Sequence, residues 1–135
     1  PNRRKRLDMS LQSSDQEAAA VAVAPRVALA DIEAAIADKF FLTGADVADV
    51  SLHVNGVMDG LSREQHVEKF PSLKVLTVCL LVMRNGYTII GKSAPASLEN
   101  FNVELGRKLA YEDCVRQIWP LMGFALRDKL ANSVN

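Results

Sequence analysis

The strongest strand pattern in the chain covers residues 75–83, where Thr77 is the only polar residue. Asn85 and Gly86 follow this run and supply the two positive-φ residues that a type I′ turn requires. Residues 87–90 then favour a returning strand, which Gly91 ends. The pattern predicts an antiparallel β-hairpin whose first strand is apolar on both faces and is therefore covered on both sides.

Apolar residues at helical spacing predict one amphipathic helix after this hairpin: Phe101, Leu105, Leu109, Val115 and Trp119. Ser97 is placed to cap the helix, and Glu99 puts negative charge in its first turn. Gly106 costs about 1 kcal/mol relative to alanine, so we expect the hairpin to pack against its backbone. Pro120 is expected to end the helix after Trp119 and to start a last short helix.

The half of the chain before the hairpin has weaker patterns. Leu29, Ile32, Ile36 and Phe40 recur at spacings of three and four, which predicts a short helix over 28–41 with Gly44 as its stop signal. Weak alternation over 47–57 indicates a strand. Ser62 and Gln65 fit a capping box that starts another short helix.

These elements predict an α+β fold: a small antiparallel sheet built on the hairpin and packed by three to four helices. Residues 1–25 lack aromatics and are rich in Arg, Ser, Gln and Ala, so we expect a disordered basic and Ala-rich tail before one domain over 26–135. Two strands alone are marginal. A third strand from 47–57 or a partner subunit should complete the sheet, and we expect a homo-oligomer on that ground.

Composition narrows the classes of function. The chain has 16 basic and 16 acidic residues, and this balance argues against a dedicated nucleic-acid binder. A basic run at the N-terminus, Arg3, Arg4, Lys5 and Arg6, keeps nucleic-acid binding open as the alternative function. It is equally compatible with a solubilising tail. No apolar run approaches the length of a membrane span, and we expect a cytoplasmic, reducing compartment.

Catalytic chemistry finds little support in the residue pattern. Cys79 and Cys114 fall in apolar stretches and are expected to be buried free thiols. His53 and His66 lack the spacing of a metal pair. The chain has no nucleotide-binding fingerprint. We therefore expect no enzyme activity, no catalytic residues, no metal and no cofactor.

A small-anion site is the remaining candidate. Residues 91–94, Gly-Lys-Ser-Ala, lack the cradle of a phosphate loop. Lys92 and Ser93 could still hold an anion together with the amides of the helix after Ser97. Arg107 and Lys108 could add charge, although a solvated helix face salted with acidic residues is the favoured explanation for them.

The C-terminal half resembles a family of small tailed-phage proteins typified by gene product 49 of coliphage N-four and gene 66 of phage Sf-six. The resemblance covers roughly 27–130, and its most specific residues are Arg84 to Thr88, Gly91 to Ala94, Asn100-Phe101, Gly106 to Ala110 and Trp119 to Leu126. The family pattern usually has Thr, a natural helix cap, where Ala28 stands.

The resemblance implies a phage or prophage origin and an accessory role, and it carries no catalytic residue set. Phage genes of this size often encode binders. The resemblance thus favours a non-catalytic accessory protein of the bacterial host's cytoplasm that acts on a host protein or sequesters a small anionic ligand, an anti-defence type of function.

Overall fold

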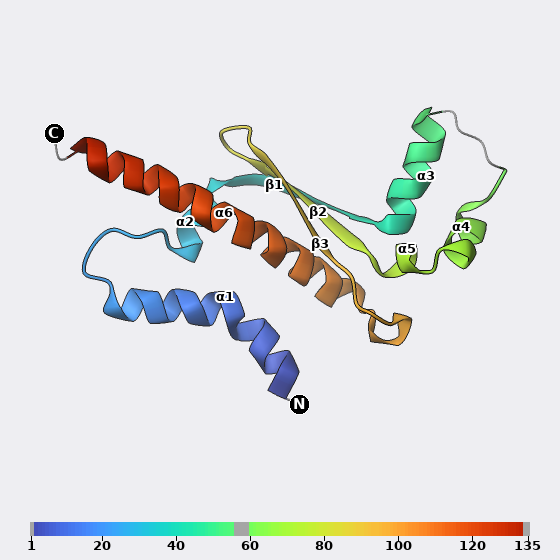
Figure 1. The fold of residues 1–135 in the computed structure, drawn as a ribbon, viewed down its shortest axis with the longest axis horizontal. Coiled ribbons are helices and arrows are strands. Elements are labelled where there is room, and N and C mark those ends of the chain that lie inside the picture. Colours follow the sequence, from blue (N-terminus) through green and yellow to red (C-terminus); the bar gives the residue numbers. More distant parts are fainter. Residues whose placement is uncertain (1, 56–59, 134–135) are drawn as a thin grey trace.

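A three-stranded antiparallel sheet and one long helix form the centre of the protein (Figure 1). The computed structural model describes residues 2–55 and 60–133, and of residues 2–10 the backbone alone. The sheet has the order β1-β2-β3, and the helix that packs on it is α6: β1 (Ile36–Thr43), β2 (Thr77–Met83), β3 (Thr88–Ser93) and α6 (Val103–Ser133). The predicted α+β class is confirmed.

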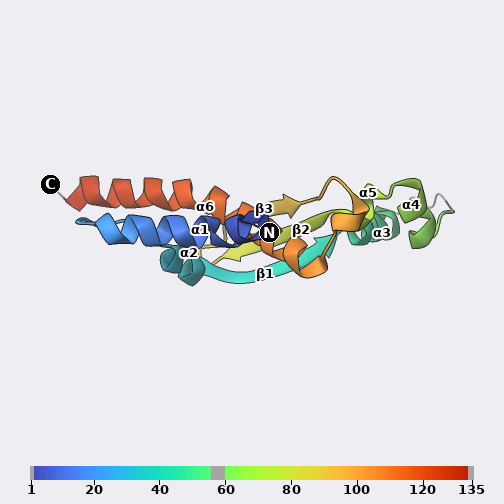
Figure 2. The same cartoon turned by 90° about the horizontal axis from the view of Figure 1, so that it is seen from below.

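Shorter elements lie at the two ends of this sheet. Figure 1 shows three of them gathered where β1 ends and β2 begins: α3 (Gly44–Asn55), α4 (Arg63–Lys69) and α5 (Ser72–Val75). Helix α2 (Leu29–Ala35) leads into β1 at the other end. Helix α1 (Asn2–Val21) lies on the same side of the sheet as α6, and a 3-10 turn, η1 (Leu98–Asn100), precedes α6 (Figures 1 and 2).

The predicted hairpin is confirmed, but its turn is not type I′. No described residue other than glycine has a positive φ, and Gly86 has a φ of 88°. The amide of Met83 donates to the carbonyl of Tyr87 (2.8 Å), and the amide of Gly86 donates to the carbonyl of Met83 (2.9 Å). This is the three-residue loop in which a left-handed glycine closes the turn. Strand β3 then continues past Gly91 to Ser93.

The core lies between α6 and the inner face of the sheet. Alternate residues of β2 are buried: Thr77, Cys79, Leu81 and Met83. They meet the buried side of α6, which includes Ala110, Cys114, Val115 and Ile118. A Cβ atom at Gly106 would lie 2.6 Å from Oγ1 of Thr77, which confirms the predicted close packing of this helix against the hairpin.

Two predictions about the ends of α6 are wrong. Ser97 precedes η1 and its side chain caps nothing; instead Oδ1 of Asn102 accepts from the amide of Leu105 (2.9 Å). Pro120 does not end the helix, which has 31 residues and contains the proline. A proline inside a helix costs about 3 kcal/mol. Side chains on both sides of it pack against the core, among them Ile118 and Met122, and this packing outweighs the cost.

Two predictions before the hairpin are wrong as well. The expected helix over 28–41 ends at Ala35, and the third strand is β1, not 47–57. The part of 47–57 that the structure describes belongs to α3, and residues 56 and 57 lie outside it. Gly44 begins that helix, because Thr43 and Asp46 exchange cap hydrogen bonds (2.9 and 3.1 Å).

The cap of α4 agrees with the sequence. Oγ of Ser62 accepts from the amide of Gln65 (3.2 Å), and Oε1 of Gln65 accepts from the amide of Ser62 (2.8 Å). This reciprocal pair satisfies two amides that the first turn of a helix leaves without an intrahelical partner. The predicted capping box is confirmed.

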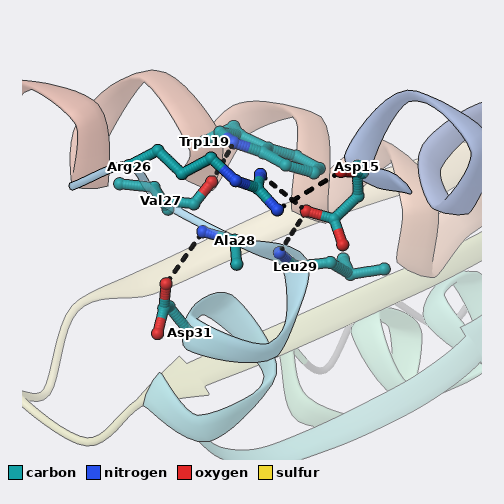
Figure 3. Close-up of polar contacts among 7 residues, drawn as sticks. All are labelled: Asp15, Arg26, Val27, Ala28, Leu29, Asp31 and Trp119. Atoms are coloured by element: carbon teal, nitrogen blue, oxygen red, sulfur yellow. Dashed lines mark hydrogen bonds and ion pairs between the residues drawn. The ribbon is translucent and has the colours of Figure 1, made fainter. Parts of the chain in front are cut away.

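Helix α1 falls within the segment predicted to be a tail. Figure 3 shows how its Asp15 carboxylate accepts from Nη1 of Arg26 (2.9 Å) and from the amide of Leu29 (3.0 Å). In the same cluster Nε1 of Trp119 donates to the carbonyl of Val27 (3.2 Å). These bonds join α1, the start of α2 and α6. Disorder of residues 1–25 and the boundary at residue 26 stay predictions.

The close contact between β3 and α6 gives a first test. A Cβ atom at Gly91 would lie 2.6 Å from Sγ of Cys114 and would also meet the carbonyl of Ala110. We expect Gly91→Ala to lower the free energy of unfolding by about 1–3 kcal/mol, because the core there has no room. Gly123→Ala is the matched control. A Cβ at Gly123 meets nothing within 4 Å, so this substitution should stabilise α6 by up to about 1 kcal/mol. Urea denaturation measures both, and shifts of the same sign would contradict the packing.

The Asp15 cluster gives a second test. The amide of Leu29, and after it the guanidinium of Arg26, lower the pKa of Asp15 below its usual 3.8. A lowered carboxyl pKa means that the bonds are intact above pH 3.8 and are lost as the pH falls through the lower, folded-state value. The only tryptophan, Trp119, lies in the same cluster. The fluorescence emission of Trp119 should therefore change in an acid titration below pH 3.8, and this transition should be absent in Asp15→Asn. Glu17→Gln, an exposed change on the same helix, should keep it.

Candidate functional site

A cavity of about 460 Å³ lies between the tip of the hairpin and the C-terminal half of α6. This volume falls within the range of sites for small molecules. Ten residues of the hairpin, α6 and the end of α2 line it: Ala35, Met83, Arg84, Asn85, Tyr87, Ile89, Ile118, Leu121, Met122 and Ala125. We call this cavity the hairpin-tip pocket.

The lining of the hairpin-tip pocket is apolar with a few polar groups. Its polar side chains are Arg84, Asn85 and Tyr87, and none of the lining residues is acidic. The rim is accessible, since Tyr87 is 54% exposed and Leu121 47% exposed. An apolar wall with a few polar groups is typical of a ligand site.

The hairpin side of the pocket is held in place by bonds to α2. Nε of Arg84 donates to the carbonyl of Ala34 (2.7 Å), and its backbone amide donates to the carbonyl of Ala35 (2.9 Å). Oδ1 of Asn85 accepts from the amide of Tyr87 (3.0 Å). The polar side of the pocket is therefore a positioned turn, and its cation is Arg84.

The residues predicted from sequence to hold an anion do not converge in one place. Lys92 is exposed on β3 and pairs in register with Val78. Ser93 lines a smaller cavity of about 120 Å³ beside Gly106. Arg107 stacks over the ring of Phe41, 5.7 Å from its centroid. Because Phe41 belongs to β1 and Lys92 to β3, the two cations lie at opposite edges of the sheet.

Two other predicted groups add little to a site. Lys108 is exposed on α6 and interacts with other groups of the protein. The basic run Arg3–Arg6 falls in the part of α1 whose side chains lie outside the described residues, so nucleic-acid binding through it stays a prediction.

The residue pattern did not predict the hairpin-tip pocket; the candidate anion site at Lys92 and Ser93 lies at the opposite end of the hairpin. A signal was present. Two of the segments that carry the family resemblance, 84–88 and 119–126, contribute residues to this one cavity. The two segments meet because α6 continues through Pro120.

Neither metal chemistry nor membrane insertion gains support. The described residues contain no group of three or more potential metal-binding side chains. Within the described chain, no helix is both long and apolar enough to cross a membrane.

Both cysteines are buried and free, as predicted. They face each other across the core, where Sγ of Cys114 donates to the carbonyl of Cys79 (3.5 Å). Burial raises the pKa of Cys114 to about 12 and also raises the pKa of Cys79. Thiols of this kind are poor nucleophiles.

The buried thiols give a third test. We expect a disulfide-exchange reagent to label neither cysteine at mildly alkaline pH in the folded protein, and to label both at once in urea. Absorbance of the released thiolate measures the rate. Fast labelling of either thiol without denaturant would contradict the burial and would make a cysteine nucleophile a candidate.

Comparisons with known proteins give one match. The sequence model of the phage protein (N4 Gp49/phage Sf6 gene 66) family matches residues 27–130. This range includes the sheet, α6 up to residue 130 and every residue that lines the hairpin-tip pocket. No curated protein and no solved structure matches the chain. The match covers most of the sequence, and the chain therefore belongs to the N4 Gp49/phage Sf6 gene 66 family of phage proteins.

Proposed function

We propose that this protein is a non-catalytic phage accessory protein whose hairpin-tip pocket sequesters a small molecule with an apolar body and one anionic group. The pocket carries the proposal. Its volume of about 460 Å³ suits a small ligand, and its walls are mostly apolar. Membership of a phage protein family agrees with an accessory role in an infected cell.

The anionic group follows from the charge of the lining. Arg84 is the one charged side chain among the lining residues. A guanidinium beside an apolar wall favours a carboxylate, sulfonate or phosphate, since hydrogen bonds to charged groups contribute about 1.5–3 kcal/mol. Removing such a ligand from the host by stoichiometric binding would be an anti-defence activity.

A host protein is the second candidate for the occupant. Exposed apolar side chains stand near the pocket on α6 and on the turn, with Phe124 73% and Tyr87 54% exposed. An apolar side chain of a partner could enter the pocket while these residues contact its surroundings. Phe124 does not line the cavity, so Phe124→Ala should weaken a protein complex and leave the binding of a small molecule unchanged.

A pair of matched probes tests the small-molecule proposal. Decanoate and decanol have the same apolar chain and differ in the charge of the head group. We expect isothermal titration to show tighter binding of decanoate, and Arg84→Gln to weaken decanoate by roughly 10- to 100-fold while decanol is unchanged. Ala125→Leu should weaken both probes by filling the pocket.

Arg107→Gln is the control for charge. This cation stacks on Phe41, away from the hairpin-tip pocket, and its loss should leave the titration unchanged. Equal binding of decanoate and decanol would contradict the anionic preference. A loss of decanoate binding in Arg107→Gln, with none in Arg84→Gln, would move the site to the helix cations predicted from the sequence.

A further inference from the structure

The outer face of the sheet, which points away from α6, is unusually apolar. The pairing register places its side chains in three rows across the strands: Asp38–Val82–Thr88, Phe40–Leu80–Ile90 and Leu42–Val78–Lys92. Six of these nine side chains are aliphatic or aromatic. Phe40 is 51%, Leu42 46% and Ile90 63% exposed.

No described helix covers this face. Helices α1 and α6 lie on the other side of the sheet, and α3 to α5 gather at its end (Figures 1 and 2). The strand β2 was predicted to be covered on both sides, because it is apolar on both faces. Its outer residues Val78, Leu80 and Val82 are half-buried, and each pairs with a residue of β1 and a residue of β3. A continuous apolar surface of this kind is a candidate interaction site.

The β3 edge of the sheet is already closed by side chains of α6. Nε2 of Gln117 donates to the carbonyl of Ile90 (2.8 Å), and Oδ2 of Asp113 accepts from the amide of Lys92 (3.0 Å). These backbone groups would otherwise be open to an added strand. The predicted oligomer also no longer needs to complete the sheet, since β1 supplies its third strand. Because the β3 edge is closed, a second copy would contact this part of the molecule through the outer face of the sheet.

The charges on the outer face make it complementary to itself. Asp38 and Lys92 stand at diagonally opposite corners of the three rows, with the apolar row of Phe40 and Ile90 between them. Consider a two-fold axis that lies in the plane of the interface and is perpendicular to the Asp38–Lys92 diagonal. It places Asp38 of each copy beside Lys92 of the other copy. The formal net charge of the chain is zero, so two copies do not repel each other overall.

We propose that the outer face of the sheet binds the same face of a second copy, with Asp38 of each chain against Lys92 of the other. The strand spacing of about 4.8 Å and the row spacing of about 6.8 Å fix the angle between the Asp38–Lys92 diagonal and the strands. The two-fold axis doubles this angle, so the strands of the two copies cross at roughly 70°. Such a steep crossing is close to orthogonal, one of the two ways in which sheets pack. A two-fold contact of this kind is the commonest form of homo-oligomer.

The size of the face sets the expected strength. Three strands and three rows give a footprint of roughly 14 Å by 20 Å, which is well below the ~800 Å² per partner of a standard interface. The dimer should therefore exchange with monomer, and it should appear as a concentration-dependent sedimentation coefficient.

Sedimentation velocity across a concentration series tests the proposal. Wild type should shift from monomer towards dimer, with a dissociation constant of roughly a micromolar to a millimolar. Ile90→Glu should stay monomeric throughout, because it buries a carboxylate in the central row. D38K and K92D should each weaken association, and the double variant D38K/K92D should restore it. This rescue depends on the diagonal pairing and not on folding.

Phe124→Glu is the matched control, since it places the same charge at an exposed apolar residue of α6 that lies away from the outer face. Its association should equal that of wild type, and circular dichroism should show that all variants fold. Three results would overturn the proposal: a wild type that is monomeric at every concentration, association that survives Ile90→Glu, and a double variant that remains as weak as the single ones. If association survives Ile90→Glu, the two copies meet at the β1 edge of the sheet. If the wild type is monomeric at every concentration, the outer face does not bind a second copy.

Discussion

The close approach of α6 to the hairpin is the constraint on which the rest of the structure depends. Gly91 and Gly106 permit it, because a side chain at either position would overlap with the opposite element. Once the helix lies this close, Cys114 reaches the backbone of Cys79, and Gln117 reaches the edge of β3. Further along α6, larger side chains stand between the helix and the tip of the hairpin. The hairpin-tip pocket lies there.

The two proposed binding surfaces lie on opposite sides of the sheet. The hairpin-tip pocket involves the inner residues Met83 and Ile89, together with α6. The outer face involves the alternate residues of the same strands. Alternation along a strand separates these sets completely. A dimer formed through the outer face would leave both pockets open, so that self-association and ligand binding could proceed in one molecule without competition.

The sequence predicted well where local chemistry decides the structure. The hairpin follows from its turn residues, and the cap of α4 follows from Ser62 and Gln65. The burial of both cysteines follows from the apolar runs in which they stand. The packing at Gly106 followed from the cost of a glycine inside a helix. The type of turn did not, since Asn85 and Gly86 suit both kinds of loop.

Prediction failed where contacts distant in sequence override local preference. Ile36 and Phe40 continue a helical spacing that starts at Leu29, yet pairing with β2 makes this segment a strand. Pro120 would end an isolated helix, but packing on both of its sides keeps α6 continuous. The hairpin-tip pocket was missed for the same reason. It combines the hairpin with residues of α6 on both sides of Pro120, and these come together only because α6 is continuous. The cations that were expected to cooperate are separated by the width of the sheet.

The closure of the β3 edge by α6 also bears on how the chain assembles. The hairpin is local and can form early, whereas β1 joins β2 only after a long loop has closed. Gln117 and Asp113 reach the edge only when α6 has docked. Until then the nascent sheet presents an unprotected strand beside an apolar surface, which is the situation in which newly made chains aggregate. Docking of the last helix is thus the step that covers both the strand edge and the inner apolar face of the sheet.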